Sequence, residues 1–114
     1  ARRAQVGAVL DFLAAQDDAQ GRPVVLAGDL NCERGGPHAE LVRAGFRPAL
    51  SGREPTFAFA GLRLRLDHIY VRGAVVEAAG VATAARGSDH WPVWAVVRAD
   101  APAAKVDTPS AHPL

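Results

Sequence analysis

The sequence has one cysteine, one lysine and no methionine among its 114 residues. The single thiol, Cys32, excludes an internal disulfide framework and a zinc site built from several cysteines. No apolar run approaches the roughly 18 residues of a membrane-spanning helix, and no signal peptide opens the chain. Because the sequence begins at Ala1 and lacks methionine, we expect a fragment, a processed chain or a trimmed one.

The sequence also has little net charge, formally +1, so no strong field indicates a general nucleic-acid or membrane surface. Its 12 arginines and 24 alanines resemble a composition bias more than an adaptation to phosphate, although arginine suits bidentate phosphate contacts. The apolar share of 49% and the length are typical of one small globular domain. Localisation stays open between the cytoplasm and secretion, since a lost N-terminus could have carried a signal peptide.

The first part of the chain predicts two helices with a strand between them. Apolar residues at helical spacing predict a helix over residues 2–17. The continuous apolar run over 23–27 predicts a strand buried on both faces. A short helix is expected to begin at Pro37 and to stop at Gly45.

The rest of the chain predicts four strands and a tail. The strands are expected over residues 56–59, 62–71, 74–83 and 91–98, the last as a central, nearly all-apolar strand. Both tryptophans, Trp91 and Trp94, are interpreted mainly as core residues. Residues 1–99 are therefore expected to carry the folded part, and the Ala/Pro-rich residues 100–114 a disordered tail with no site.

Gly28-Asp29-Leu30-Asn31 follows the first predicted strand. In an extended segment, Asp29 and Asn31 point the same way and Leu30 turns back into the core. A carboxylate beside an amide can hold a water molecule and a phosphoryl oxygen together. The alternative is that Asp-x-Asn forms only a turn or a helix cap.

Leu66-Asp67-His68-Ile69-Tyr70 lies within the strand expected over 62–71. Period-2 alternation puts Asp67 in an apolar layer, where a carboxylate needs a partner. The alternative partner is Arg65, in a salt bridge near the strand end. His68 falls on the opposite face and is interpreted as a packing histidine.

Ser88-Asp89-His90 precedes the last strand, and both Asp89 and His90 can reach one site from a loop. A carboxylate can fix the tautomer of an imidazole and stabilise its charged form, so His90 could act as an acid or electrophile beside a phosphate. Two other residues are interpreted without function: His38 as an exposed or capping residue, and Cys32 as a small filler.

Carboxylates and imidazoles at the ends of buried strands are costly unless they bind something. Three such motifs in a short chain suggest a common site, whose most natural occupant is a divalent metal with a phosphate. In order along the chain, the segments 24–31, 56–57, 65–71 and 88–93 resemble the endonuclease/exonuclease/phosphatase superfamily, a group of metal-dependent phosphoesterases.

The resemblance covers roughly residues 4–98 and implies an α/β (α+β) fold, the DNase I-like four-layer α/β/β/α sandwich. This chain would supply roughly the C-terminal half of it. The implied activity is hydrolysis of a phosphodiester or phosphomonoester by in-line attack of activated water, with Mg²⁺, or alternatively Mn²⁺ or Ca²⁺, as cofactor. Small molecules, lipid head groups and nucleic acids all remain candidate substrates.

By the same resemblance, Asp29 would orient or deprotonate the attacking water, and Asn31 would position it or bind a phosphate oxygen. Asp67 would orient His90, His90 would bind the scissile phosphate, and Asp89 would contribute to the metal region. An asparagine and a metal-binding glutamate of the family's N-terminal half have no counterpart here. We therefore expect that half as a partner, an apolar sheet face exposed without it, and little turnover by this chain alone. The alternative is a non-catalytic interaction domain that keeps the fold, or an inactive fragment.

Overall fold

The computed structural model describes residues 2–16, 22–33 and 35–99, and the expected tail over 100–114 lies outside them. The described residues form helices and strands in the order α1 Arg2–Ala15, β1 Val24–Asp29, α2 Gly36–Arg43, β2 Arg47–Pro48, β3 Phe57–Phe59, β4 Leu62–Leu64, β5 Asp67–Arg72, β6 Ala74–Val81 and β7 Val93–Ala99. No described helix has the length and apolar content needed to cross a membrane.

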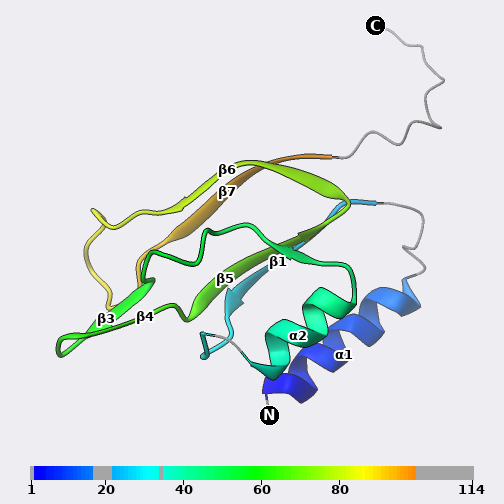
Figure 1. Cartoon of the computed structure of the whole chain (residues 1–114), viewed down its shortest axis with the longest axis horizontal. Coiled ribbons are helices and arrows are strands. Elements are labelled where there is room, and N and C mark those ends of the chain that lie inside the picture. Colours follow the sequence, from blue (N-terminus) through cyan, green and yellow to red (C-terminus); the bar gives the residue numbers. More distant parts are fainter. Residues whose placement is uncertain (1, 17–21, 34, 100–114) are drawn as a thin grey trace, which may run out of the picture.

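These elements stack in three layers (Figure 1). A central antiparallel sheet has the strand order β1-β5-β2. The helices α1 and α2 cover one face of it, and the two-stranded sheet β6-β7 lies on the other side, packed chiefly over β5. The mixed α+β class expected from the sequence is confirmed, and the described residues form an α/β/β part of the four-layer sandwich.

The core lies between the helices and the central sheet. It joins Val6 of α1, Leu41 of α2, Tyr70 of β5, and Phe46, which lies between α2 and β2. Their burial stabilises the fold by roughly 25 cal/mol for each Å² of apolar surface removed from water. The predicted first helix is confirmed, but Val9, which shares its apolar pattern, is 40% exposed.

The expectation that the first strand is buried on both faces is wrong. Leu26 is half-buried against the helices, whereas Val25 is 48% exposed on the opposite face. The reason is the position of the second sheet. Because β6 and β7 pack mainly over β5, the outward face of β1 keeps an open apolar surface.

The single strand predicted over residues 62–71 is divided in two. β4 pairs with β3 as a hairpin, while β5 pairs with β1, and Arg65 and Leu66 lie between them outside either strand. At this break the buried Thr56 hydroxyl accepts the N–H groups of Leu66 and Asp67, at 2.9 and 3.0 Å. Side-chain hydrogen bonds therefore replace ladder bonds where the chain passes from one sheet to another.

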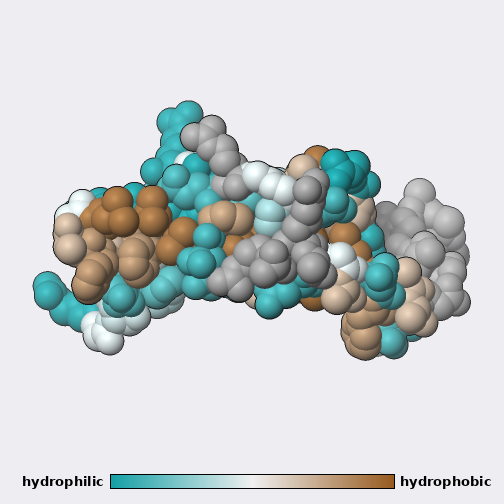
Figure 2. Space-filling model, turned by 90° about the horizontal axis from the view of Figure 1, so that it is seen from below, coloured by the Kyte–Doolittle hydropathy of each residue, from teal (hydrophilic) through white to brown (hydrophobic). Residues whose placement is uncertain are grey.

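The last strand is not central, because β7 pairs with β6 alone among the described strands. Trp94, expected in the core, is 44% exposed and rests on Gly80, where a Cβ atom would lie 3.0 Å from the indole. Exposed apolar groups also gather at the tip of the β3–β4 hairpin, where Phe59 and Leu62 are mostly exposed (left end of Figure 2).

Candidate active site

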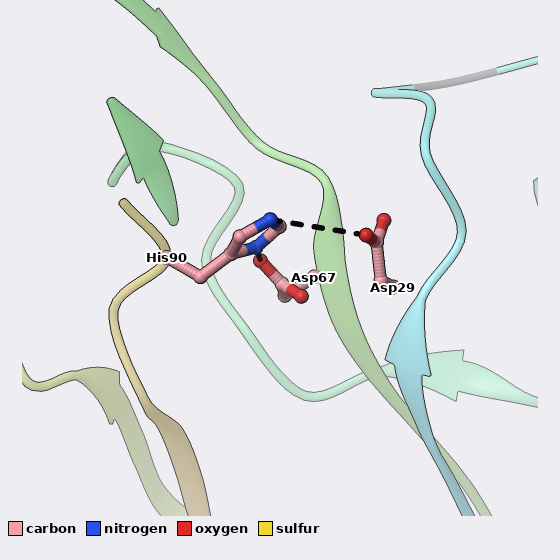
Figure 3. Close-up of side chains that lie close together, drawn as sticks. All are labelled: Asp29, Asp67 and His90. Carbon is pink, nitrogen blue, oxygen red and sulfur yellow. Dashed lines mark hydrogen bonds and ion pairs between the residues drawn. The ribbon is translucent and has the colours of Figure 1, made fainter. Parts of the chain in front are cut away.

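Asp29 and Asp67 are direct partners at the end of the β1–β5 ladder. Opposite residues of an antiparallel pair point to the same face, so two carboxylates lie side by side there. Like charges directly opposite each other destabilise a sheet unless a third group compensates them. The imidazole of His90 supplies that group, reaching in from the segment before β7 (Figure 3).

His90 contacts the two carboxylates through its two different nitrogens. Nδ1 lies 2.7 Å from Asp67 Oδ2, a short hydrogen bond, and Nε2 lies 3.9 Å from Asp29 Oδ2. The second distance is too long for a direct hydrogen bond. Nε2 therefore faces Asp29 with its hydrogen-bonding capacity available, while Asp67 holds the ring from behind.

The pKa of His90 is raised above its ordinary value. The hydrogen bond to Asp67 is the main cause, burial opposes it, and the negative charges of Asp67, Asp29 and Asp89 add to the rise. A protonated imidazole between two carboxylates offsets part of the negative charge of this strand end. Its side chain is 34% exposed, so a ligand can approach the ring.

The segment around Thr56 holds both members of the Asp67–His90 pair. Thr56 is 1% exposed, its hydroxyl accepts the N–H of Asp67, and its carbonyl accepts the N–H of Trp91 at 2.8 Å. The neighbouring Phe57 ring packs edge-on against the imidazole, with centroids 4.9 Å apart. Sequence reasoning assigned Thr56 no role, because a threonine can be recognised as a buried hydrogen-bond acceptor only once the groups that donate to it are known.

The extended geometry expected across Gly28-Asp29-Leu30-Asn31 does not continue past β1. Asn31 adopts a left-handed conformation with φ 57°, and its N–H donates to Asp29 Oδ1 at 2.6 Å. This is the turn kept open as the alternative. The expectation that Leu30 turns into the core is confirmed. Asp29 faces His90, whereas the exposed Asn31 is not part of the carboxylate–imidazole group.

The structure also bears on two further interpretations from the sequence, the partner of Asp67 and the place of Asp89. Among the described ion pairs Asp67 bonds to His90, not to Arg65. Asp89 is exposed, and its carbonyl accepts the N–H of Ala58 at 2.8 Å. Its carboxylate acts on the charge of His90 without joining the group that Asp29, Asp67 and His90 form.

The opposite face of β5 carries a second polar group. His68 lies there as expected, half-buried, with Nε2 2.9 Å from the carbonyl of Cys32 and with its pKa lowered chiefly by burial. The interpretation of His38 as exposed or capping is wrong, because Nδ1 of its half-buried ring lies 2.5 Å from the hydroxyl of Tyr70. Burial also raises the pKa of Tyr70.

The Asp29–Asp67–His90 group is the candidate metal centre of the described residues, with one potential ligand atom from each lying within 4.8 Å of the others. Two carboxylates suit a hard divalent ion such as Mg²⁺ or Ca²⁺. Because a cation repels a protonated His90, the two aspartates fit an ion better than the imidazole does. They supply only part of the six oxygens that Mg²⁺ requires.

Hollows adjoin both carboxylates. A cavity of about 280 Å³ borders Thr56 and Asp67 and is also lined by Glu33, Glu54 and Arg65. A second one, of about 260 Å³, lies between α1 and β1 and borders Asp29. Of the two side chains themselves, Asp29 is the more accessible, at 44% exposed against 15% for Asp67.

The protein is thus an α+β sandwich that carries two strand-end carboxylates and one histidine at a common site. The model of the Endonuclease/Exonuclease/phosphatase family matches residues 1–90, and the chain belongs to that family. Its described residues form part of a DNase I-like fold.

One solved structure is similar over most of the chain. It is described as a functionally unknown conserved protein from Enterococcus faecalis V583, with 26% sequence identity and a TM-score of 0.63. The similarity covers 87% of this chain but 46% of that one, so the chain spans about half the length of this relative. No protein of curated function matches the sequence.

Proposed function

We propose that this chain supplies the water-activating and phosphate-binding side of a metal-dependent phosphoesterase. The reaction is hydrolysis of a phosphodiester or phosphomonoester by in-line attack of water. The observation that carries the proposal is the Asp67–His90–Asp29 arrangement, in which one imidazole stands between two strand-end carboxylates. Membership of a family of phosphate-ester hydrolases supports it.

In this mechanism His90 binds the phosphate. Asp67 accepts a hydrogen bond from Nδ1–H at 2.7 Å, which leaves Nε2–H on the far side of the ring, available to a ligand. A protonated ring then donates Nε2–H to a non-bridging phosphoryl oxygen and stabilises the charge that develops on it. The raised pKa of His90 keeps this donor protonated to higher pH.

Asp29 orients or deprotonates the attacking water. Its carboxylate is 44% exposed, and Oδ1 is held by the N–H of Asn31 while Oδ2 faces His90. The distance of 3.9 Å between Asp29 Oδ2 and His90 Nε2 supports a site in which the group that activates water and the N–H that binds phosphate would act side by side. The Asn31 side chain is proposed to position the water or to bind a phosphate oxygen.

The cofactor is proposed to be Mg²⁺, with Mn²⁺ or Ca²⁺ as alternatives. When bound, such an ion neutralises negative charge on the phosphate. Asp29 and Asp67 would hold it, and Asp89, which adds to the negative charge around His90, would contribute to the metal region. The remaining oxygens would come from water, from the substrate and from a segment beyond this chain.

That further segment is proposed to be an N-terminal half of the domain. Three features support it: the similar structure is about twice as long, β1 is an edge strand among the described strands, and Val25 of the same strand is 48% exposed. This chain alone would then turn over little substrate. A non-catalytic interaction domain is the competing proposal, although it gives no reason for a solvent-accessible Asp67–His90 pair.

The test is hydrolysis of a chromogenic phosphodiester by the full-length protein, with His90→Ala and His90→Asn as variants. We expect a loss of roughly 10²-fold or more in kcat, since a charge-stabilising donor contributes on this scale. EDTA should abolish activity and added Mg²⁺ should restore it. Undiminished turnover by His90→Ala, or indifference to EDTA, would reject the phosphoesterase.

A further inference from the structure

We propose that His38 and His68 are positioning residues that together hold the turn from which Asp29 reaches the site. Both imidazoles converge on one atom, the carbonyl oxygen of Cys32. Nε2 of His68 lies 2.9 Å from it and Nε2 of His38 lies 3.3 Å from it. The role of Asp29 rests on the proposed function, whereas these contacts do not depend on it.

The partners determine where the protons lie. A carbonyl oxygen only accepts, so both contacts require a hydrogen on Nε2, and Nε2 of His38 also lies 3.7 Å from Cys32 Sγ. In neutral His38 this leaves Nδ1 as an acceptor, and the hydroxyl of Tyr70 donates to it at 2.5 Å. Since Tyr70 is 5% exposed and part of the core, the chain of hydrogen bonds begins at a rigid point of β5.

From Cys32 the constraint passes along the backbone to Asp29. The preceding residue, Asn31, has its N–H aimed at Asp29 Oδ1 at 2.6 Å. With Oδ1 held in this way, Oδ2 is the oxygen that faces His90. On this proposal, anchoring the Cys32 carbonyl restrains the short turn that also carries the Asn31 N–H, and with it the direction of the Asp29 carboxylate.

The same turn is also tied on its far side. Glu33 Oε2 accepts the N–H of Arg65 at 2.8 Å, and the N–H of Leu30 donates to the Leu66 carbonyl at 2.9 Å. Asp29 is itself exposed, so packing does not restrict its side chain. The turn that follows Asp29 is instead held by hydrogen bonds from His68 of β5 and His38 of α2, which makes His38 a link between the helical layer and this turn.

The experiment follows the Asn31 amide by NMR in the full-length protein and in three variants. His38→Leu removes the donor to Cys32, whereas His38→Gln keeps an N–H at a similar reach. Tyr70→Phe removes only the proton given to His38. We expect His38→Leu to shift the Asn31 amide proton upfield and to speed its hydrogen exchange about five- to tenfold, the scale of one lost hydrogen bond. His38→Gln should restore both, and Tyr70→Phe should fall between them.

Val6→Ala is the control for general destabilisation, because Val6 of α1 belongs to the same core cluster as Tyr70 and its side chain has no hydrogen-bonding group. It should lower the melting temperature and leave the Asn31 amide unchanged. An unchanged Asn31 signal in His38→Leu, or an equal change in Val6→Ala, would overturn the proposal. If the NMR effect is present while phosphoester hydrolysis is absent from the parent protein, the positioning holds and only the proposed function fails.

Discussion

Asp29 and Asp67 stand directly opposite each other across the β1–β5 ladder, and the imidazole of His90 bridges the two carboxylates. Antiparallel register forces both onto one face, where their repulsion would weaken the sheet end. A protonated His90 offsets part of that repulsion. The strand end is thus more stable when His90 is protonated, in line with its raised pKa.

The first prediction concerns the charge of His90. Because hydrogen bonding to Asp67 raises its pKa, His90 should titrate above 6.5 in NMR spectra of its ring protons. The stabilisation from this pair is fully present below 6.5, the unfolded value, and is lost as pH rises through the folded pKa. Asp67→Asn should move the pKa of His90 back toward its ordinary value. A pKa unchanged in Asp67→Asn would contradict the assignment of Asp67 as the main cause.

The second prediction concerns Asp29. In the full-length protein, Asp29→Asn should lower kcat for a phosphodiester by roughly 10²- to 10³-fold, because an amide neither accepts a proton from water nor binds a cation well. Asp11→Asn is the matched control, since Asp11 is an exposed aspartate of α1 away from the site. Equal kinetic effects of the two substitutions would show that charge alone, and not position, matters.

The third prediction concerns Thr56 and protein stability. Thr56→Val keeps the shape of the side chain but leaves the N–H groups of Leu66 and Asp67 without their acceptor. The free energy of unfolding should fall by about 1–3 kcal/mol, measured by denaturant titration. Thr56→Ser keeps the hydroxyl and should lose much less. Similar losses in the two variants would assign the effect to packing of the methyl group.

The fourth prediction concerns acid stability. Burial lowers the pKa of His68, so protonation favours the unfolded chain. The stabilisation is present above 6.5, the unfolded value, and is lost as pH falls through it toward the lowered folded pKa. His68→Asn should flatten the dependence of the melting temperature on pH below this value. If His68→Asn kept the same dependence of the melting temperature on pH as the unsubstituted protein, another titrating group would be responsible for it.

The fifth prediction concerns the metal. Mn²⁺ added to the full-length protein should broaden NMR signals of Asp29 and Asp67 before others, and Mg²⁺ should reverse this by competition. The same titration of this chain alone should need much higher Mn²⁺, because two carboxylates supply only part of a six-oxygen shell. Equally tight binding by both forms would remove the need for further ligands from another segment.

Period-2 alternation within residues 67–71 was enough to predict which face each side chain takes. It put Asp67 opposite to His68, and the structure confirms this with one facing His90 and the other Cys32. The same reasoning failed at Arg65 and Leu66, because a change of partner strand interrupts the period. Alternation holds only while a strand keeps the same partner strand. Nothing in the sequence indicates that the Thr56 hydroxyl takes over the backbone hydrogen bonds at this break.

Other misses have one cause, namely that burial depends on which layer lies above a residue. Val25 and Trp94 are apolar, as strand residues in a core should be, yet both are substantially exposed, since no described element covers them. His38 shows the opposite error, because it was expected to be exposed and is half-buried. Its place near a helix start suggested solvent, and only the approach of β5 to α2 puts Tyr70 beside it.

The sequence by itself determined the helices, most strands and the residue types of the site, because local spacing encodes which side chains share a face. It also determined the family, through motifs kept in order along the chain. Only the tertiary structure decided that Asp29, Asp67 and His90 meet while Asp89 stands outside their group. That decision rests on the β1–β5 register and on a turn whose hydrogen bonds join residues far apart in the chain, which no local pattern specifies.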